Sequence, residues 1–232
     1  MTEREMDDIL KRAAAARRAV EPELLDRLAA SLGSPLEPVR PQPPVWLLTC
    51  GLILAAAAIA IAGAARSGFF GVFKLSAGQC AVIFAALAIF LCLSAAEAVR
   101  ERIPGSRRLA GPETTLAIGS AALLTVFASL FHDYHTDHFV HAGLACLATG
   151  VLHAIPAALA GWLIMRRGFA VNPGAAGVAA GTLAGLAGVT MLELHCANLQ
   201  TLHIIVWHLA VLPVCAGAGA LLAWVPRYHR AH

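Results

Sequence analysis

Histidine and cysteine side chains gather in two polar stretches in the second half of the chain. In the first stretch, 131–141, histidines are spaced three residues apart, and in the second, 193–200, a histidine precedes a cysteine. Cys146 and His203 lie within a few residues of these stretches. Thiolates and imidazoles are ligands of zinc, copper and similar soft or borderline ions. This composition is therefore suited to metal binding.

Three interpretations of these side chains are open. Cys146 and Cys196 could form a disulfide, which persists in an oxidising compartment. The cysteines and histidines could instead bind zinc, copper or a cadmium-type ion. In the third interpretation they are ordinary packing and interfacial residues. No resident cofactor is expected, and a metal ion would act as a signal. The candidate metal ligands besides the two cysteines are His132, His135, His138, His141, His195 and His203.

Six apolar segments must position these residues. They cover 45–65, 77–99, 114–131, 141–165, 174–194 and 201–225. A bilayer core about 30 Å thick is crossed by roughly 20 apolar residues in a helix, and helices satisfy all of their backbone hydrogen bonds internally. Together with a hydrophobic content of 59%, the segments predict an all-α bundle of six transmembrane helices.

The distribution of Lys and Arg predicts the topology. The two tails and the second and fourth loops hold 15 of these residues, whereas the first, third and fifth loops hold 2. Because Lys and Arg are enriched on the cytoplasmic side, both termini are expected in the cytoplasm and the histidines and cysteines outside. The expected domains are a cytoplasmic tail at 1–44, an inner-membrane domain at 45–225 and a cytoplasmic tail at 226–232.

The N-terminal tail has the pattern of two short helices followed by a proline-rich linker. Its apolar residues fall at helical spacing, but the stripes are too narrow to build an independent core. The tail is therefore expected to lie on membrane lipid or to dock on a partner protein that buries the stripes. The leucines that would make the partner contact are Leu10, Leu24, Leu25, Leu28 and Leu32.

Glycines recur at four-residue spacing in the fifth apolar segment, at Gly177, Gly181 and Gly185. Such a row lets two helix backbones approach closely. We expect this helix to pack tightly either inside the bundle or at the contact of a homodimer.

Several short motifs resemble one known family. They are the linker LEPVRPQPP at 36–44, one cysteine in the fourth apolar segment, the step Leu194-His195-Cys196 after the fifth, and the stretch IIVWH at 204–208. With six membrane helices, this arrangement resembles the NrsF-like negative regulators of extracytoplasmic-function (ECF) sigma factors. The resemblance covers nearly the whole chain.

That resemblance implies a membrane anti-sigma factor. Its cytoplasmic N-terminal region would hold an ECF sigma factor inactive, and two outer cysteines, here Cys146 and Cys196, would be needed for the response to metal or oxidative stress. The histidine-rich third loop is not part of the family pattern. The expected partners are the sigma factor and membrane lipid, with no direct contact to nucleic acid.

Other functional classes make different predictions. The sequence has no metalloprotease, phosphate-loop or nucleophile-elbow motif, so it is not expected to be an enzyme. The main alternative is a membrane transporter or metal-handling protein that uses the outer histidines and cysteines as an entry site. A structural subunit of a larger membrane complex is a third interpretation.

Overall fold

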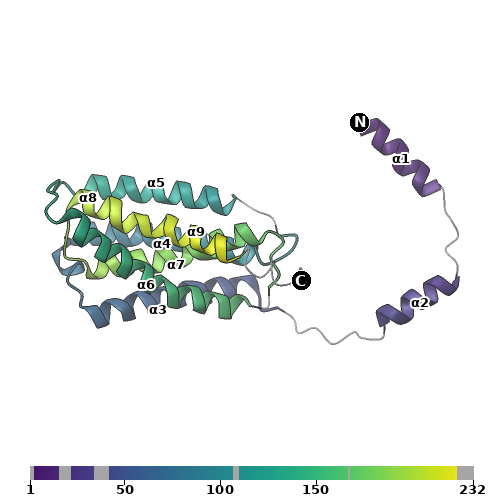
Figure 1. Ribbon diagram of the computed structural model, residues 1–232, viewed down its shortest axis with the longest axis horizontal. Helices are drawn as coiled ribbons and strands as arrows, with labels where there is room; N and C mark the ends of the chain where they lie inside the picture. Colours follow the sequence, from purple (N-terminus) through teal and green to yellow (C-terminus); the bar gives the residue numbers. More distant parts are fainter. Residues whose placement is uncertain (1–2, 16–21, 34–41, 107–109, 167, 224–232) are drawn as a thin grey trace. The chain divides into compact units, whose positions relative to one another are not determined.

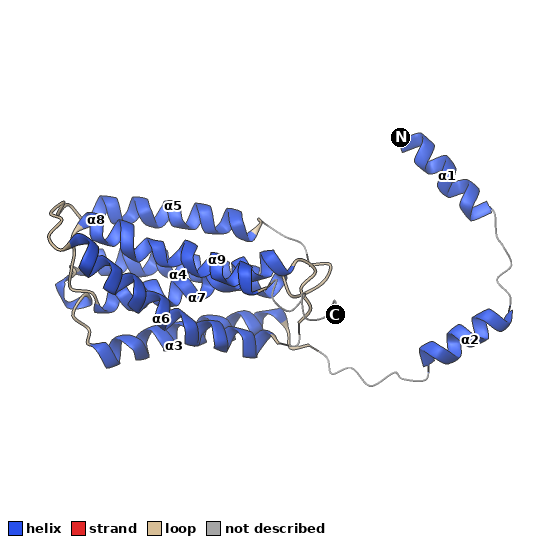
Figure 2. Cartoon of the chain, in the orientation of Figure 1, coloured by secondary structure: helices blue, strands red, loops and turns tan. Residues whose placement is uncertain are grey.

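The computed structural model describes residues 3–15, 22–33, 42–106, 110–166 and 168–223 (Figure 1). The chain divides into two compact units, Met1–Pro41 and Gln42–His232, and each is described by itself. All regular secondary structure in the described ranges is helical (Figure 2). Within these ranges, six helices are long and apolar enough to cross a membrane. The predicted all-α architecture with six transmembrane helices is confirmed.

The first unit contains two short helices, α1 (Glu3–Ala15) and α2 (Pro22–Gly33). Leu24, Leu25 and Leu28 of α2 are each about half exposed, at 50%, 53% and 47%. Nothing in the described part of this unit covers them. Leu10 lies in α1 and Leu32 in α2, but the side chains of both fall outside what the structure describes.

The second unit is the membrane bundle. Five of its spans are single helices, and the sixth is built from three consecutive pieces: α8 (Thr201–His203), a π-helix η2 (Ile204–His208) and α9 (Leu209–Leu222). The predicted C-terminal tail at 226–232 lies outside the described residues. The single-helix spans are α3 (Val45–Ser67), α4 (Ala77–Arg100), α5 (Pro112–Leu130), α6 (Phe139–Met165) and α7 (Pro173–His195), with a 3₁₀ turn η1 (Val72–Lys74) between α3 and α4.

Local sequence signals set where several of these helices begin. Ser76 and Gln79 form a reciprocal capping box at the start of α4, which satisfies two otherwise unpaired backbone donors. Asn172 caps α7 through a hydrogen bond from the Ala175 amide. A proline follows the capping position in both α5 and α7, where its missing N–H costs nothing.

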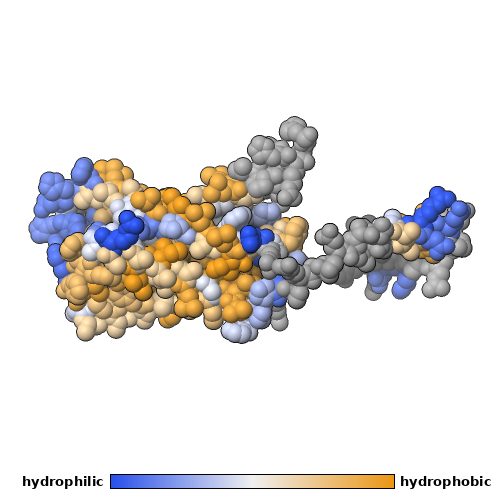
Figure 3. Space-filling view, turned by 90° about the horizontal axis from the view of Figure 1, so that it is seen from below, coloured by the Kyte–Doolittle hydropathy of each residue, from blue (hydrophilic) through white to orange (hydrophobic). Residues whose placement is uncertain are grey.

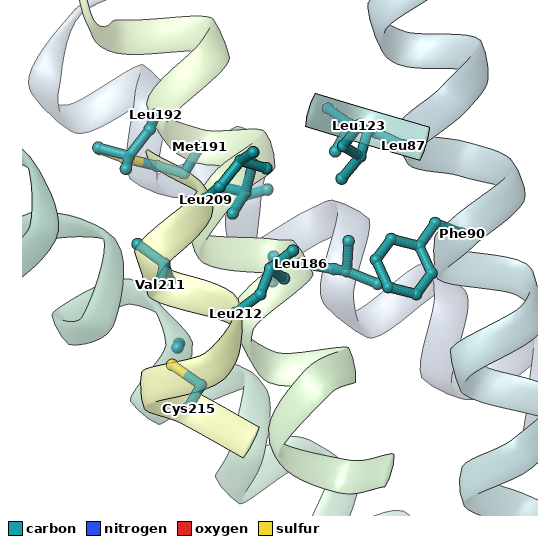
Figure 4. Packing of buried hydrophobic residues seen from close by; sticks show 14 of the residues in the cluster. Leu87, Phe90, Leu123, Leu186, Met191, Leu192, Leu209, Val211, Leu212 and Cys215 are labelled. Carbon is teal, nitrogen blue, oxygen red and sulfur yellow. The ribbon is translucent and has the colours of Figure 1, made fainter. Parts of the chain in front are cut away.

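Helix α7 is the centre of the bundle. Of its membrane window, 78% is buried, compared with 11% for α5. Leu186 and Leu192 of α7 pack against Leu209 and Leu212 of the last span (Figure 4). The face of the bundle seen in Figure 3 is mostly apolar, and hydrophilic residues gather toward one end, at the left of the picture. This distribution suits helices that face lipid.

The glycine row of α7 is used inside the bundle. A methyl group on Gly177 would collide with the backbone of Gly219, and one on Gly181 would collide with the backbone at Cys215. Both partners belong to α9. The row therefore lets α7 and α9 pack backbone to backbone, which is the first of the two arrangements expected from the sequence.

Candidate cysteine and histidine site

Four metal-ligating side chains converge at one end of the bundle: Cys146, Cys196, His203 and His208. One ligand atom from each can be chosen so that all four lie within 4.8 Å of one another. Cys146 comes from α6, Cys196 from the turn after α7, His203 from α8 and His208 from η2. Among the residues that the structure describes, this is the one group of its kind with three or more members. We refer to these four residues as the Cys/His cluster.

The two sulfur atoms are in direct contact. Cys146 Sγ and Cys196 Sγ are 3.5 Å apart, although the residues are separated by 50 positions in the sequence. Both cysteines are free thiols in this structure; Cys196 is buried and Cys146 is partly exposed. The sulfurs are thus close enough to share a proton or a metal ion, and a small movement would bring them to the length of a disulfide, about 2.05 Å.

Two buried histidines complete the cluster. His203 Nε2 lies 3.7 Å from Cys196 Sγ. His208 Nδ1 donates a hydrogen bond of 2.7 Å to Glu193 Oε1, and His203, His208 and Glu193 are all at most 3% exposed. His208 Nε2 and His203 Nδ1 have no hydrogen-bond partner within the described ranges. The carboxylate therefore fixes the tautomer of His208 and leaves the lone pair on Nε2 available.

Cys196 is the more acidic of the two thiols. The hydrogen bond from Cys146 lowers the pKa of Cys196 below its ordinary value, and the neighbouring imidazoles of His203 and His208 act in the same direction. Burial of the thiol opposes this shift. Because the thiolate is both the nucleophile and the metal ligand, Cys196 is prepared for either kind of chemistry.

The π-helix places the two histidines on the same side of the sixth span. An α-helix turns about 100° per residue, so residues five apart would be separated by about 140° around its axis. In a π-helix the backbone bonds join residues five apart, which brings such a pair back to one side. The ring centroids of His203 and His208 are accordingly only 5.4 Å apart, edge to face.

Neighbouring loops hold the turn that carries Cys196. The Gly71 amide bonds the carbonyl of Leu194 at 3.2 Å, His195 Nδ1 donates to the carbonyl of Gly68 at 2.9 Å, and Lys74 Nζ donates to the carbonyl of Ala197 at 3.1 Å. The α3–α4 loop and the end of α3 therefore hold this turn through three hydrogen bonds. The close approach requires a glycine at 71, since a Cβ there would lie 2.6 Å from the Cys196 carbonyl oxygen.

The other histidines that the sequence indicated lie outside the cluster. His132, His135, His138 and His141 are exposed. His135 pairs with Asp133 at 2.8 Å; this hydrogen bond raises the pKa of His135 and lowers the pKa of Asp133. The structure thus brings Cys146, Cys196 and His203 together, as the sequence proposed, and leaves out the histidines of the third loop and His195.

Sequence reasoning omitted His208 from the ligand set and gave Glu193 no part in it. On an α-helix His208 would lie more than one turn below His203 and on a different face of the helix. The signal that could have found them is ionisable side chains at membrane depth, which are costly there and are functional candidates by default.

The sequence of the chain matches one known family. The sequence model of the family described as NrsF, negative regulator of sigma F, matches residues 32–227. The chain belongs to the NrsF family. The match spans all six membrane helices and the whole Cys/His cluster. No curated protein and no solved structure gives a significant match.

Membership in the NrsF family gives the general role. The family description supports negative regulation of a sigma factor, with a sigma factor as the protein partner. A regulatory family of this kind is in keeping with a chain that is not an enzyme. The resemblance drawn from the linker, the two cysteines and the IIVWH stretch is confirmed.

Proposed function

We propose that this protein is an anti-sigma factor of the bacterial inner membrane. It holds an ECF sigma factor through its N-terminal tail and releases it when metal binding or thiol oxidation changes the Cys/His cluster. The observation that carries the proposal is the contact between Cys146 and Cys196 beside two buried histidines, in a chain whose family is that of a negative regulator of a sigma factor.

The N-terminal tail has the properties of a docking segment. Leu24, Leu25 and Leu28 are about half exposed, and helices as short as 13 and 12 residues are marginal by themselves in water. An amphipathic helix of this kind gains stability by laying its apolar face in a groove of a partner. Leu10 and Leu32 extend the same faces in the sequence. In this proposal residues 1–44 dock the sigma factor and residues 45–225 sense the signal.

Orientation follows from charge. The three loops at the end of the bundle that holds the cluster carry 2 of the 17 Lys and Arg residues. By the positive-inside rule we expect the cluster outside and both tails, including 226–232, in the cytoplasm. The tail then shares a compartment with the sigma factor, and the cluster faces the periplasm. Zinc, copper or cadmium ions, or an oxidant, would reach the cluster from that side.

Both stimuli can change the geometry of the cluster. Thiol oxidation forms one S–S bond, releases two protons and passes two electrons to an external oxidant, and it draws the sulfurs from 3.5 Å to about 2.05 Å. A metal ion would keep them apart and draw in the histidines. Either change releases the partner only to the extent that it stabilises the low-affinity state, and tenfold weaker binding corresponds to about 1.4 kcal/mol.

Co-purification tests the docking half of the proposal. The full-length protein should retain an ECF sigma factor in mild detergent, and removal of residues 1–34 should abolish retention and switch on the regulon of that sigma factor. Retention by the truncated protein would contradict the assignment of the tail.

Cysteine variants test the sensing half. Cys146→Ser and Cys196→Ser should bind the sigma factor but fail to release it on exposure to Cd²⁺ or peroxide. Cys80→Ser is the matched control, because Cys80 lies near the same end of the bundle and outside the cluster. Normal induction in both Cys146→Ser and Cys196→Ser would refute sensing at these thiols.

A membrane transporter or metal-handling protein is the alternative that the cluster itself favours, since the same side chains could receive a metal for passage. This alternative predicts that removal of residues 1–34 leaves metal handling intact and changes no sigma-dependent transcription.

A further inference from the structure

We propose that Cys146, Cys196, His203 and His208 form a closed four-coordinate site for a divalent cation of the Zn²⁺ and Cd²⁺ class. The regulatory meaning of this site rests on the proposed function, but metal binding itself does not. The inference goes beyond two sensing cysteines, because it assigns two buried histidines as ligands and excludes the histidine-rich loop.

The distances fit tetrahedral coordination. With bonds of about 2.3 Å to sulfur and 2.0–2.1 Å to nitrogen, a tetrahedral site puts two sulfurs about 3.8 Å apart and a sulfur and a nitrogen about 3.6 Å apart. The observed separations are 3.5 Å for the two sulfurs and 3.7 Å from Cys196 Sγ to His203 Nε2. Because all four ligand atoms lie within 4.8 Å of one another, closing the site around an ion needs movements of about 1 Å at most.

Glu193 prepares His208 as a ligand. It accepts the hydrogen from Nδ1 at 2.7 Å, which leaves Nε2 as the coordinating atom. Zinc-bound histidines almost always donate their other nitrogen in this way to a carboxylate or a carbonyl. The buried Nε2 has no hydrogen-bond partner in the described part of the protein. An unpaired buried nitrogen is costly, and a metal ion would remove that cost.

The charge of the four ligand side chains favours a divalent ion. The four ligands, two thiolates and two neutral imidazoles, carry two negative charges, which a divalent cation cancels, and the carboxylate of Glu193 is compensated by its hydrogen bond from His208 Nδ1. Cancellation matters here because His203 and His208 are at most 1% exposed, and an uncompensated buried charge is strongly destabilising. A monovalent ion such as Cu⁺ would leave one negative charge in the cluster. The thiolates favour Zn²⁺ or Cd²⁺ over the oxygen-seeking Mg²⁺ and Ca²⁺.

Four protein ligands leave no open coordination position. Sites with four protein ligands hold their metal for a structural purpose, whereas catalytic sites keep one position for water or substrate. Two of the ligands belong to the continuous segment α8–η2, so a bound ion would also stabilise the π-turn that brings them together. The ion would therefore act on helix geometry rather than pass through the protein.

Metal titration of the full-length protein tests the site. The protein is purified in detergent under reducing conditions, stripped with a chelator and titrated with Cd²⁺, followed by thiolate-to-metal charge-transfer absorbance. Co²⁺ then reports geometry through its visible bands. We expect one ion per chain and the spectrum of a tetrahedral thiolate–imidazole site. Zn²⁺ should also slow the alkylation of Cys146 in the wild-type protein and leave Cys80 unaffected.

Variants assign the ligands. Cys196→Ser and His208→Gln should each lower Cd²⁺ affinity by more than 100-fold, and Glu193→Gln should lower it by about 10–100-fold, as outer-shell changes do. Cys80→Ser and His135→Ala are the matched controls and should bind as the wild type does. The site is refuted if the wild type binds no Cd²⁺, if Co²⁺ gives an octahedral spectrum, or if His135→Ala loses the metal and His208→Gln keeps it.

The same experiment separates the site from the regulatory proposal. If Cd²⁺ binds with these ligands but retention of the sigma factor is unchanged, the site stands and metal-driven release fails. If Cd²⁺ does not bind but Cys146→Ser and Cys196→Ser still block induction by peroxide, the site is refuted and the regulator senses oxidation alone.

Discussion

A single methyl group on the α3–α4 loop should impair the Cys/His cluster without touching a ligand. The change is Gly71→Ala. Gly71 has φ −69° and ψ −55°, which an alanine adopts without strain. Any effect of the substitution is therefore steric and does not come from the backbone conformation.

The size of the disturbance follows from the geometry. The new Cβ would lie 2.6 Å from the Cys196 carbonyl oxygen and 2.8 Å from the Glu193 carbonyl oxygen. A carbon and a carbonyl oxygen ordinarily stay at least about 3.3 Å apart, so one of the two loops must move by about 0.7 Å. Metal–ligand bond lengths vary by only about 0.2 Å. A loop displacement of about 0.7 Å therefore adds appreciably to the movement of about 1 Å that closing the site around an ion already needs.

We expect Gly71→Ala to lower Cd²⁺ affinity by at least about tenfold, the lower end of the range for outer-shell changes, and to blunt release of the sigma factor. The assay is the charge-transfer titration of the full-length protein in detergent. Gly78→Ala is the control. Gly78 lies in the first turn of α4, directly after the α3–α4 loop, and a Cβ there would meet nothing within 4 Å. Wild-type affinity in Gly71→Ala would refute the argument that this loop holds Cys196 in place.

Two further predictions concern the bundle and the third loop. Gly181→Ala should destabilise the protein by about 1–3 kcal/mol through overpacking against α9. Gly217→Ala is the control, because its Cβ would meet nothing within 4 Å, and it should be neutral or stabilising by up to about 1 kcal/mol. Equal unfolding midpoints of the two variants in detergent would contradict this prediction. Asp133→Asn should lower the pKa of His135 in an NMR titration, because the carboxylate of Asp133 raises that pKa. The ion pair is fully formed below the ordinary histidine pKa and is lost as the pH rises through the raised value. An unchanged titration of His135 would show that the contact does not form in solution.

The sequence was sufficient to predict the fold because each membrane span is marked by the hydropathy of its own residues. Hydropathy and length locate six spans, and the predicted start of the sixth at Thr201 coincides with the start of α8. The glycine row likewise predicts a backbone contact, since small residues at four-residue spacing have one main structural use in a membrane helix. The partner of that row, α9, could not be read from the row itself.

The site was only partly predictable. Cys146, Cys196 and His203 were identified from residue type and position near one end of the bundle. His208 was missed because its place depends on the π-turn, and nothing in the stretch IIVWH at 204–208 marks a departure from the α-helix. The regular histidines of the third loop carried the stronger pattern, yet that loop is exposed and His135 pairs with Asp133 instead.

The backbone contact between α7 and α9 limits how a signal can leave the cluster. Loss of the π-turn would require α9 to advance by one residue, about 1.5 Å, and to turn by about 100°. Gly219 would then no longer face Gly177, and a residue with a side chain would be forced against the α7 backbone, where even a Cβ has no room. The contact therefore opposes a shift of α9 along α7, and a signal that leaves the cluster through the sixth span must move these two helices together as a pair.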